Sequence, residues 1–376
     1  MAGTIIGMAA AAVWVYLIAF RGGFWRLPDD AAAAGPMPAR SIVAVIPARD
    51  EADVIGRAVA SLLAQDYRGE LHIVVVDDRS SDGTAAVVHA AAAGAADRLT
   101  VVTGEPLPSG WTGKLWAVRQ GIAIAAPRRP DYLLLTDADI VHAPDNLTRL
   151  VAQAESGRYD LVSLMVRLHC RGFWERLLIP AFVFFFFKLY PPRWVADPAC
   201  HTAAAAGGCM LIRRTALERI GGIDSIRREI IDDCALARRV KTIGRVWLGM
   251  ARETRSLREY RSWRPIWEMI TRCAFAQLGY SAVALIAMVA LMLVIYVMPP
   301  LLLLSGSWWG ALLGATAWLA MSGAYLPMLR FYRCPILLVP LLPAIALFYA
   351  AATVASAIHF WRGRGGEWKG RFQAAG

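Results

Sequence analysis

The sequence predicts an α/β domain with a mostly parallel sheet, joined to membrane helices near both ends of the chain. Between residues 42 and 166, short apolar segments alternate with amphipathic ones. This alternation is typical of right-handed strand–helix–strand crossovers and of a sheet covered on both faces. A long apolar run opens the chain and three more close it. With 57% hydrophobic residues and a mean hydropathy of +0.44, the 376 residues are too apolar for a single soluble globule.

Five strands are expected, each a short apolar run that ends in polar residues. They are residues 42–46, 71–76, 99–103, 132–136 and 161–166. After the first strand, apolar residues recur at helical spacing, and the apolar face consists of Val54, Ile55, Ala58, Val59, Leu62 and Leu63. Further helices are expected near residues 83–93, 113–126 and 144–155.

The first apolar run, residues 4–20, is followed rather than preceded by positive charge, at Arg21 and Arg26. This order predicts an anchor whose N-terminus lies outside and whose following domain lies in the cytoplasm. A cleavable signal ending in the alanines of residues 31–34 is the alternative. The prolines and alanines of residues 27–40 indicate a linker.

Three apolar segments, residues 278–304, 308–329 and 335–360, are expected to span the membrane. The uncharged turn 305–307 suits the outside and the basic turn 330–333 the inside. Strict alternation would then place the tail outside, although it carries Arg362, Arg364, Lys369 and Arg371. Either the proline-rich last segment does not simply span the membrane, or the tail is exported.

A shorter apolar run within residues 173–190 falls well short of the ~20 residues needed to span a bilayer. Basic residues bracket it, which predicts an interfacial element in the headgroup region; a buried core helix is the alternative. The expected organisation is therefore an N-terminal membrane anchor (1–26), an α/β domain (41–275) with the interfacial segment 173–190, C-terminal transmembrane helices (278–360) and a basic tail (361–376).

The net charge of +11 comes almost entirely from arginine, because the lysines are limited to Lys114, Lys188, Lys241 and Lys369. Basic residues cluster beside the apolar segments, where anionic headgroups attract them, so a nucleic-acid partner is not expected. The cysteines form no CxxC pair, which indicates free thiols in a reducing compartment. They are Cys170, Cys200, Cys209, Cys234, Cys273 and Cys334.

Acidic side chains follow three of the expected strands, in Pro47-Ala-Arg-Asp-Glu51, Asp77-Asp-Arg-Ser-Ser-Asp82-Gly-Thr84 and Asp137-Ala-Asp139. The carboxyl ends of parallel strands lie side by side, and this edge is where open α/β sheets bind ligands. Carboxylates crowded there suit Mg²⁺ or Mn²⁺ holding phosphate oxygens. The alternative is that these residues are ordinary turn and helix-cap residues.

The sequence has neither a GxGxxG after the first strand nor a GxxxxGK[ST] motif, which argues against a dinucleotide dehydrogenase and a P-loop ATPase. A nucleotide bound at the acidic edge would need a bridging divalent cation. Lys114 stands at an expected helix start, where its charge and free backbone N–H groups suit phosphate; an ordinary surface lysine is the alternative.

The three acidic segments, together with Gly113-Lys114, resemble the successive motifs of family-2 glycosyltransferases with the GT-A fold. Gly207-Gly-Cys-Met-Leu-Ile-Arg-Arg214 is similar to the acceptor-side segment of that family, and Ile231-Asp-Asp-Cys-Ala-Leu236 to its Glu-Asp-x-x-Leu motif. The resemblance covers residues 41–275. The pattern looks most like bacterial hopene-associated (hopanoid-biosynthesis) glycosyltransferases and, more distantly, ceramide glucosyltransferases.

The resemblance implies an inverting hexosyltransferase of the bacterial inner membrane that moves a sugar from a UDP-sugar to a lipid hydroxyl, such as a hopanoid. It implies that Asp139 binds Mg²⁺ or Mn²⁺, that Asp233 is the general base, and that Gly207, Gly208 and Cys209 lie on the acceptor side. The implied donor-binding residues are Pro47, Arg49, Glu51, Asp77, Asp78, Lys114 and Asp137.

Two departures from the family pattern matter. The glutamate of the Glu-Asp motif is Asp232 here, which leaves either aspartate as the base, and Cys273 after Arg272 breaks the Gln/Arg-x-x-Arg-Trp signature of processive relatives. Neighbouring aspartates raise one another's pKa, which suits a general base. Two further interpretations stay open: a polyprenyl-phosphate acceptor, which needs no base, and a non-catalytic nucleotide-sugar-binding membrane regulator.

Overall fold

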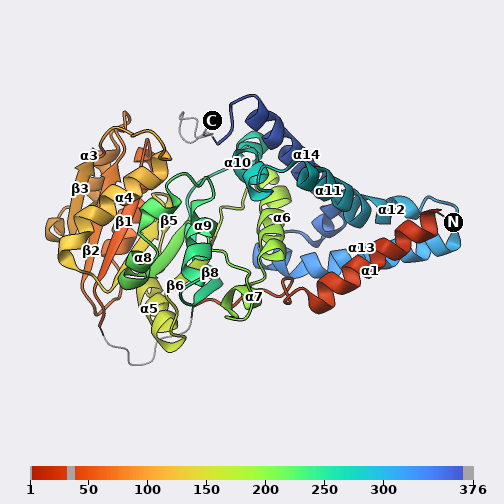
Figure 1. Cartoon of the computed structure of the whole chain (residues 1–376), viewed down its shortest axis with the longest axis horizontal. Helices are drawn as coiled ribbons and strands as arrows, with labels where there is room; N and C mark the ends of the chain where they lie inside the picture. The colour runs from red at the N-terminus through yellow and green to blue at the C-terminus, as the bar shows by residue number, and fades with distance from the viewer. Residues whose placement is uncertain (1, 32–38, 367–376) are drawn as a thin grey trace.

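The computed structural model describes residues 2–31 and 39–366. Within them, eight strands form one sheet in the order β3-β2-β1-β4-β7-β6-β8-β5 (Figure 1). All five expected strands are present, with the fifth as β6. The strands are β1 Ile42–Ala48, β2 Leu71–Asp77, β3 Leu99–Thr103, β4 Tyr132–Thr136, β5 Ile140–Val141, β6 Leu161–Arg167, β7 Cys209–Arg213 and β8 Val246–Ser256.

The sheet is mostly parallel, which confirms the fold class predicted from the sequence. Strand β1 pairs in parallel with β2 and β4, β2 with β3, and β6 with β8. Strand β7 lies between β4 and β6 and is antiparallel to both, and the short β5 is antiparallel to β8. The chain reaches β7 after a long excursion that begins at the end of β6, and it enters the sheet from the opposite direction.

Helices cover both faces of the sheet because alternate strand residues point to opposite sides. Ile42, Ala44 and Ile46 belong to one core, with α2 Ala52–Leu63, α3 Thr84–Ala91 and α5 Asn146–Ser156. Val43 and Val45 belong to the other core, with α4 Gly113–Ala125 and α9 Asp232–Lys241. Shorter helices are η1 Ala96–Arg98, η2 Ala126–Arg128, α7 Pro192–Ala196, α8 Arg214–Arg219 and η3 Ile223–Ile226.

A second, helical part of the molecule extends away from the sheet (Figure 1). It contains α1 Ala2–Phe20, α10 Trp263–Gln277, α11 Ala282–Met292, η4 Leu293–Val297, α12 Met298–Leu302, α13 Trp308–Phe331, η5 Ile336–Leu341 and α14 Leu342–Trp361. Four segments are long and apolar enough to cross a membrane, namely Gly3–Phe20, Ala282–Leu302, Trp308–Phe331 and Ile336–Trp361. Helix α1 packs on α13, and α10 packs on α14.

The last apolar segment begins beside the residues that follow β6 and ends beside the start of α11. At its start, the Cys334 and Cys170 sulfurs are 3.7 Å apart, and Cys170 follows β6 closely. At its end, the Phe360 ring stacks on Tyr280, just before α11, with centroids 4.5 Å apart. Ala357 shares a small core with Leu285 of α11. The end of α14 therefore lies beside the start of α11.

The expected interfacial segment forms helix α6, Phe173–Leu189, which lies between the sheet and the apolar helices and runs across the direction of α13 (Figure 1). Most of its apolar side chains are buried against the rest of the protein, and it contacts α10, α13 and α14. Its depth relative to a bilayer stays a prediction. Pro36 and Pro38 of the expected linker, and Lys369 and Arg371 of the tail, lie outside the described residues.

Candidate active site

A cavity of about 510 Å³ opens where the carboxyl ends of β1 and β4 meet the N-terminus of α9. Helices α6 and α10 form its opposite wall. The sequence-predicted site residues that line it are Pro47, Glu51, Lys114, Asp137, Asp139, Gly207, Gly208, Asp232 and Asp233. Residues predicted for the donor side, for the base and for the acceptor side thus line one cavity, although they come from segments far apart in the sequence.

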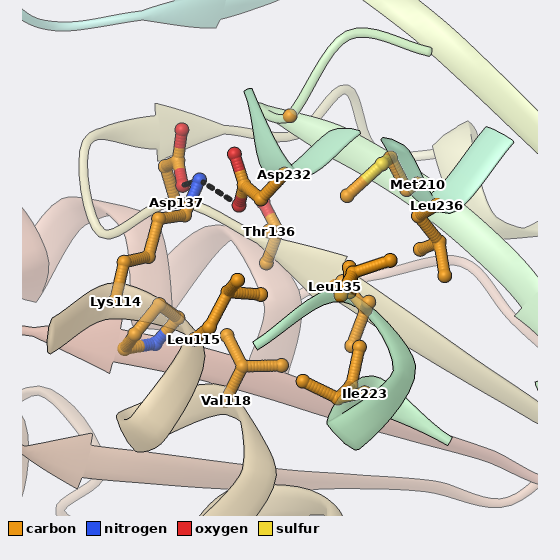
Figure 2. Close-up of a pocket in the computed structure, with 13 residues that line it drawn as sticks. Lys114, Leu115, Val118, Leu135, Thr136, Asp137, Met210, Ile223, Asp232 and Leu236 are labelled. Carbon is orange, nitrogen blue, oxygen red and sulfur yellow. Dashed lines mark ion pairs between the residues drawn. The ribbon is translucent and has the colours of Figure 1, made fainter. Parts of the chain in front are cut away.

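Lys114 bridges two of the acidic segments. Its Nζ is 2.9 Å from Asp137 Oδ1 and 3.2 Å from Asp232 Oδ2, and Figure 2 shows the ammonium between them. Burial alone would lower the pKa of Lys114, but the two carboxylates outweigh it and raise this pKa. Apolar side chains such as Leu115 and Val118 lie beneath this charged layer (Figure 2). Because these apolar side chains lower the local dielectric constant, they strengthen the ion pairs above them.

Asp233 is held by backbone donors. Its Oδ2 accepts a hydrogen bond from Gly207 N at 2.8 Å, and its Oδ1 accepts one from Cys234 N at 2.7 Å. Burial and the neighbouring charge of Asp232 raise the pKa of Asp233 to about 6. A Cβ at position 207 would lie 3.3 Å from both Asp233 Oδ2 and Lys114 Nζ, so glycine permits this close approach.

A chain of buried hydrogen bonds joins the end of β4 to the glycines. Thr136 Oγ1 donates to Gly208 O at 2.7 Å, and His142 Nε2 lies 3.1 Å from Thr136 Oγ1. His142 Nδ1 pairs with Asn146 Nδ2 at 3.0 Å. Burial lowers the pKa of His142 to about 3, so the ring is neutral. Because the Asn146 amide donates to Nδ1, Nε2 carries the proton and donates to Thr136.

Asp139 and Glu51 share a partner that the sequence motifs did not reveal. Arg258 Nη2 is 2.8 Å from Glu51 Oε1, and Arg258 Nε is 3.8 Å from Asp139 Oδ2. The Ser256 hydroxyl also donates to Asp139 Oδ2. Ser256 is the last residue of β8 and Arg258 lies in the loop that follows, both more than a hundred residues from Asp139. No sequence motif marks either residue.

Four predicted residues do not line the cavity. Arg49 Nη1 donates to Asp78 O at 2.7 Å and Asp77 Oδ1 accepts from Ser80 N at 3.0 Å, so they brace the loops after β1 and β2. Cys209, predicted on the acceptor side, has a fully buried side chain that lies on the other face of the sheet, with its Sγ 3.8 Å from Asn146 Nδ2.

Residues 43–221 match the family model described as glycosyl transferase family 2. These residues are similar to a family-2 glycosyltransferase domain and are called the family-2 domain below. This match spans a little under half of the chain, and it includes all of β1 except its first residue, the strands from β2 to β7, Asp139 and the start of α4, where Lys114 lies. Asp233 and Arg258 lie beyond the matched residues.

Two curated relatives of the family-2 domain are N-acetylglucosaminyltransferases. The protein from Rhizobium leguminosarum bv. viciae is 33% identical over 114 residues, and that from Mesorhizobium japonicum is 37% identical over 143 residues. These regions cover 30% and 35% of this chain and only 25% and 31% of those proteins' own lengths.

A solved structure resembles almost the whole chain. It is a mannosyltransferase from Pyrobaculum calidifontis in complex with GDP-mannose and Mn²⁺, with a TM-score of 0.59 and 21% sequence identity. The match covers 95% of this chain and 98% of that one. At this identity the similarity establishes the fold, which is the GT-A type sheet with its flanking helices.

The acidic end of the family-2 domain fits a divalent cation. Among the described residues, no three His, Cys, Asp or Glu side chains gather closely enough to hold a metal by themselves. However, Mg²⁺ is typically bound through one or two carboxylates, with water and substrate phosphates completing its shell. Asp139 and Asp137 both face the cavity, which has room for a diphosphate. These two carboxylates therefore suit a divalent cation that binds together with a nucleotide.

Proposed function

We propose that the chain is an inverting glycosyltransferase that moves a sugar from a nucleotide-sugar to a hydroxyl group of a membrane lipid. One observation carries this proposal: a single cavity joins the carboxylates after β4 and at the start of α9 to a mostly apolar wall on the side of the candidate membrane helices. A donor with a charged diphosphate fits the first end of the cavity, and a lipid fits the second.

The donor is proposed to be a UDP-sugar. Pro47, Glu51, Lys114 and Asp137 line its end of the cavity, while Arg49, Asp77 and Asp78 shape the two loops beside it. Because both curated relatives are named N-acetylglucosaminyltransferases, UDP-N-acetylglucosamine is the first donor to test.

In the proposed reaction, the acceptor oxygen attacks the anomeric carbon while the bond from that carbon to the diphosphate oxygen breaks. Asp233 takes the acceptor proton, since it faces the cavity and its pKa of about 6 leaves it ionised at neutral pH. Asp232 is engaged by Lys114, which favours Asp233 as the base. A Mg²⁺ or Mn²⁺ ion held by Asp139 would stabilise the departing diphosphate as a Lewis acid. Arg258 supplies a further positive charge at this end.

The acceptor is proposed to be a lipid with a bulky apolar body, such as a hopanoid. Phe182 and Phe186 of α6, with Pro265 and Met269 of α10, line the cavity opposite the carboxylates. Both helices contact the apolar helices, so a lipid would reach Asp233 from the bilayer side. The expected location is the bacterial inner membrane, with the family-2 domain in the cytoplasm.

A second candidate acceptor is a polyprenyl phosphate. Arg272 lines the cavity at the α10 wall, where its positive charge would suit an acceptor phosphate. A phosphate oxygen is already ionised at neutral pH and needs no general base.

The test compares wild-type protein with Asp233→Asn in detergent, with UDP-sugars, Mn²⁺ and either a polyhydroxylated hopanoid or a polyprenyl phosphate. Hydroxyl transfer predicts product only with the hopanoid, and a loss of at least ~10²-fold in kcat for the variant. Product from polyprenyl phosphate with full activity in Asp233→Asn would replace the first candidate by the second. Absence of product with every lipid would contradict both.

A further inference from the structure

Glu175, in the first turn of α6, is a buried carboxylate that accepts four hydrogen bonds; its exposed fraction is 2%. Its Oε2 accepts from Arg171 N at 2.8 Å and from Gly172 N at 2.7 Å. Its Oε1 accepts from His169 Nδ1 at 2.8 Å and from Tyr260 N at 2.7 Å. Burial alone would raise the pKa of Glu175, but these donors outweigh it and lower this pKa.

The bond from Tyr260 differs from the other three. Those three are local and belong to the start of α6, as expected for a glutamate in a first helical turn. The Tyr260 bond instead joins positions 85 residues apart and reaches loop 257–262, which connects β8 to α10. The carboxylate thus ties a helix beside the acceptor wall to a loop at the donor end.

Backbone hydrogen bonds hold loop 257–262 in place on both sides of Arg258. On one side, Leu257 N donates to Asp139 O at 2.8 Å, and Arg258 N donates to Ser256 Oγ at 3.1 Å. On the other side, Tyr260 N donates to Glu175. Between these two anchors the Arg258 side chain extends to Glu51 and Asp139. The direction of the guanidinium therefore depends on both anchors.

We propose that Glu175 is a positioning residue for donor binding, which fixes the loop that carries Arg258 into the cavity. The inference rests on the proposed function, since the place of Arg258 matters to the reaction only if a nucleotide binds beside Glu51 and Asp139. Among the described residues, Glu175 does not line the cavity, so it acts through the loop. Helix α6 then organises both ends of the site, through Glu175 for the donor and through Phe182 and Phe186 for the acceptor.

The experiment compares wild type, Glu175→Gln, Arg258→Ala and the double variant in detergent. Calorimetry measures the Kd of UDP with Mn²⁺, and of GDP with Mn²⁺ in parallel. Hydrogen exchange measures protection of the Tyr260 amide without nucleotide. Glu218→Gln is the matched control, because Glu218 pairs with Arg214 on the surface of α8, away from the cavity.

Glu175→Gln is expected to weaken nucleotide binding about tenfold, since one oxygen that accepts two hydrogen bonds is replaced by a donor. Arg258→Ala is expected to weaken it at least as much, and the double variant no more than Arg258→Ala alone, because the two residues act through one contact. The Tyr260 amide should exchange faster in Glu175→Gln and not in Glu218→Gln. Should Glu175→Gln not fold, Glu175→Asp keeps the charge and shortens the reach to Tyr260.

Additive losses in the double variant would overturn the proposal, because they would mean that Glu175 does not act through Arg258. Unchanged nucleotide affinity in Glu175→Gln would overturn it as well. If wild-type protein binds neither UDP nor GDP, the proposed donor site itself is wrong. That failure is distinguishable, because exchange at Tyr260 still reports whether Glu175 holds the loop.

Discussion

Asp137, Asp232 and Asp233 are three carboxylates gathered around one lysine. Lys114 bonds directly to Asp137 and Asp232, and its charge also lowers the pKa of Asp233. The cluster keeps a net negative charge, which favours a divalent cation and raises the proton affinity of a base.

The pH dependence of the reaction tests the role of Asp233. Burial and Asp232 raise its pKa to about 6, so we expect kcat/KM to fall below pH 6 as this carboxylate becomes protonated. Because this pKa lies above the unfolded value of ~3.9, the ionised group destabilises the fold above pH 6, and the penalty is lost as the pH falls toward 4. Asp233→Asn should therefore raise Tm at pH 7.5 and not at pH 4. If the residual kcat/KM of Asp233→Asn still fell below pH 6, this assignment would be contradicted.

Lys114→Met should move this fall in kcat/KM to higher pH. Lys114 lowers the pKa of Asp233, so its removal is expected to shift the apparent pKa upward by roughly one to three units. The pH profile of kcat/KM for the variant measures this shift. A profile that keeps its midpoint near pH 6 would mean that Lys114 does not act on the base.

At the residue scale, the sequence motifs predicted the acidic edge but not all of its partners. Asp137, Asp139 and Lys114 were identifiable because short-range spacing places them at strand and helix ends. Arg258 was not, because its position depends on how β8 pairs with β5 across more than a hundred residues. The motif that contains Cys209 did not show that its side chain is buried in the core on the other face of the sheet, because the motif does not say which face of a strand borders the cavity.

At the scale of elements, a chain of hydrogen bonds from Asn146 through His142 and Thr136 to Gly208 stabilises the junction of β4 and β7. This chain keeps Asp137 at the end of β4 close to Gly207, whose N–H holds Asp233. The precision of the site is therefore set by a buried polar network behind it.

Replacing His142 with leucine tests that network. The change leaves the polar groups of Thr136 and Asn146 without this partner, and we expect a loss of about 1–3 kcal/mol in the free energy of unfolding. The matched control is His89→Leu, at an exposed position of α3, which should change stability by less than about 0.5 kcal/mol. Equal effects of the two substitutions on denaturant unfolding would contradict the network's role.

Helix α6 provides the second test at this scale. Phe186→Ala removes part of the apolar wall, so the KM for the lipid acceptor should rise about tenfold or more, as expected for the loss of a large apolar contact. The affinity for UDP should not change. Phe173→Ala is the control, because Phe173 is 69% exposed at the start of α6. An equal change in both variants would show that the wall does not contact the acceptor.

Strand positions were predictable to within about a residue where apolar runs were short and bounded, as for 99–103 and 132–136. The antiparallel strand β7 was recognised only as an acceptor-side motif, because its direction is set by the path of the chain through α6 and α7. Residues 173–190 contain α6, whose central residues are buried by protein, and a position of this helix in the headgroup region stays a prediction.

For the whole molecule, the contacts of α14 bear on the side of the C-terminal tail. In the sequence, the positive charge of the tail indicated the inside of the membrane, whereas strict alternation of spans indicated the outside. In the structure, the segment between Cys334 and Phe360 starts beside Cys170, which follows β6, and ends beside Tyr280, which precedes α11. This arrangement favours a re-entrant segment that leaves the membrane on the side where it entered.

We therefore predict that residues 361–366 lie on the same side of the membrane as the family-2 domain. A fluorescent protein fused after the tail should fluoresce in the cytoplasm, and alkaline phosphatase inserted at Gly306 should be active outside. The basic turn at Arg330–Arg333 agrees with this orientation. Active phosphatase fused after the tail would instead indicate a full final span.

Lipid-dependent product formation tests the central claim most directly. Wild type, Asp139→Ala and Asp233→Asn are incubated with UDP-N-acetylglucosamine and other UDP-sugars, Mn²⁺ and a polyhydroxylated hopanoid, with Asp97→Asn as an exposed control. Mass spectrometry then identifies the glycosylated lipid. We predict a product that both site substitutions abolish and that the control leaves unchanged. Product formed equally by wild type and Asp139→Ala would contradict the proposed chemistry.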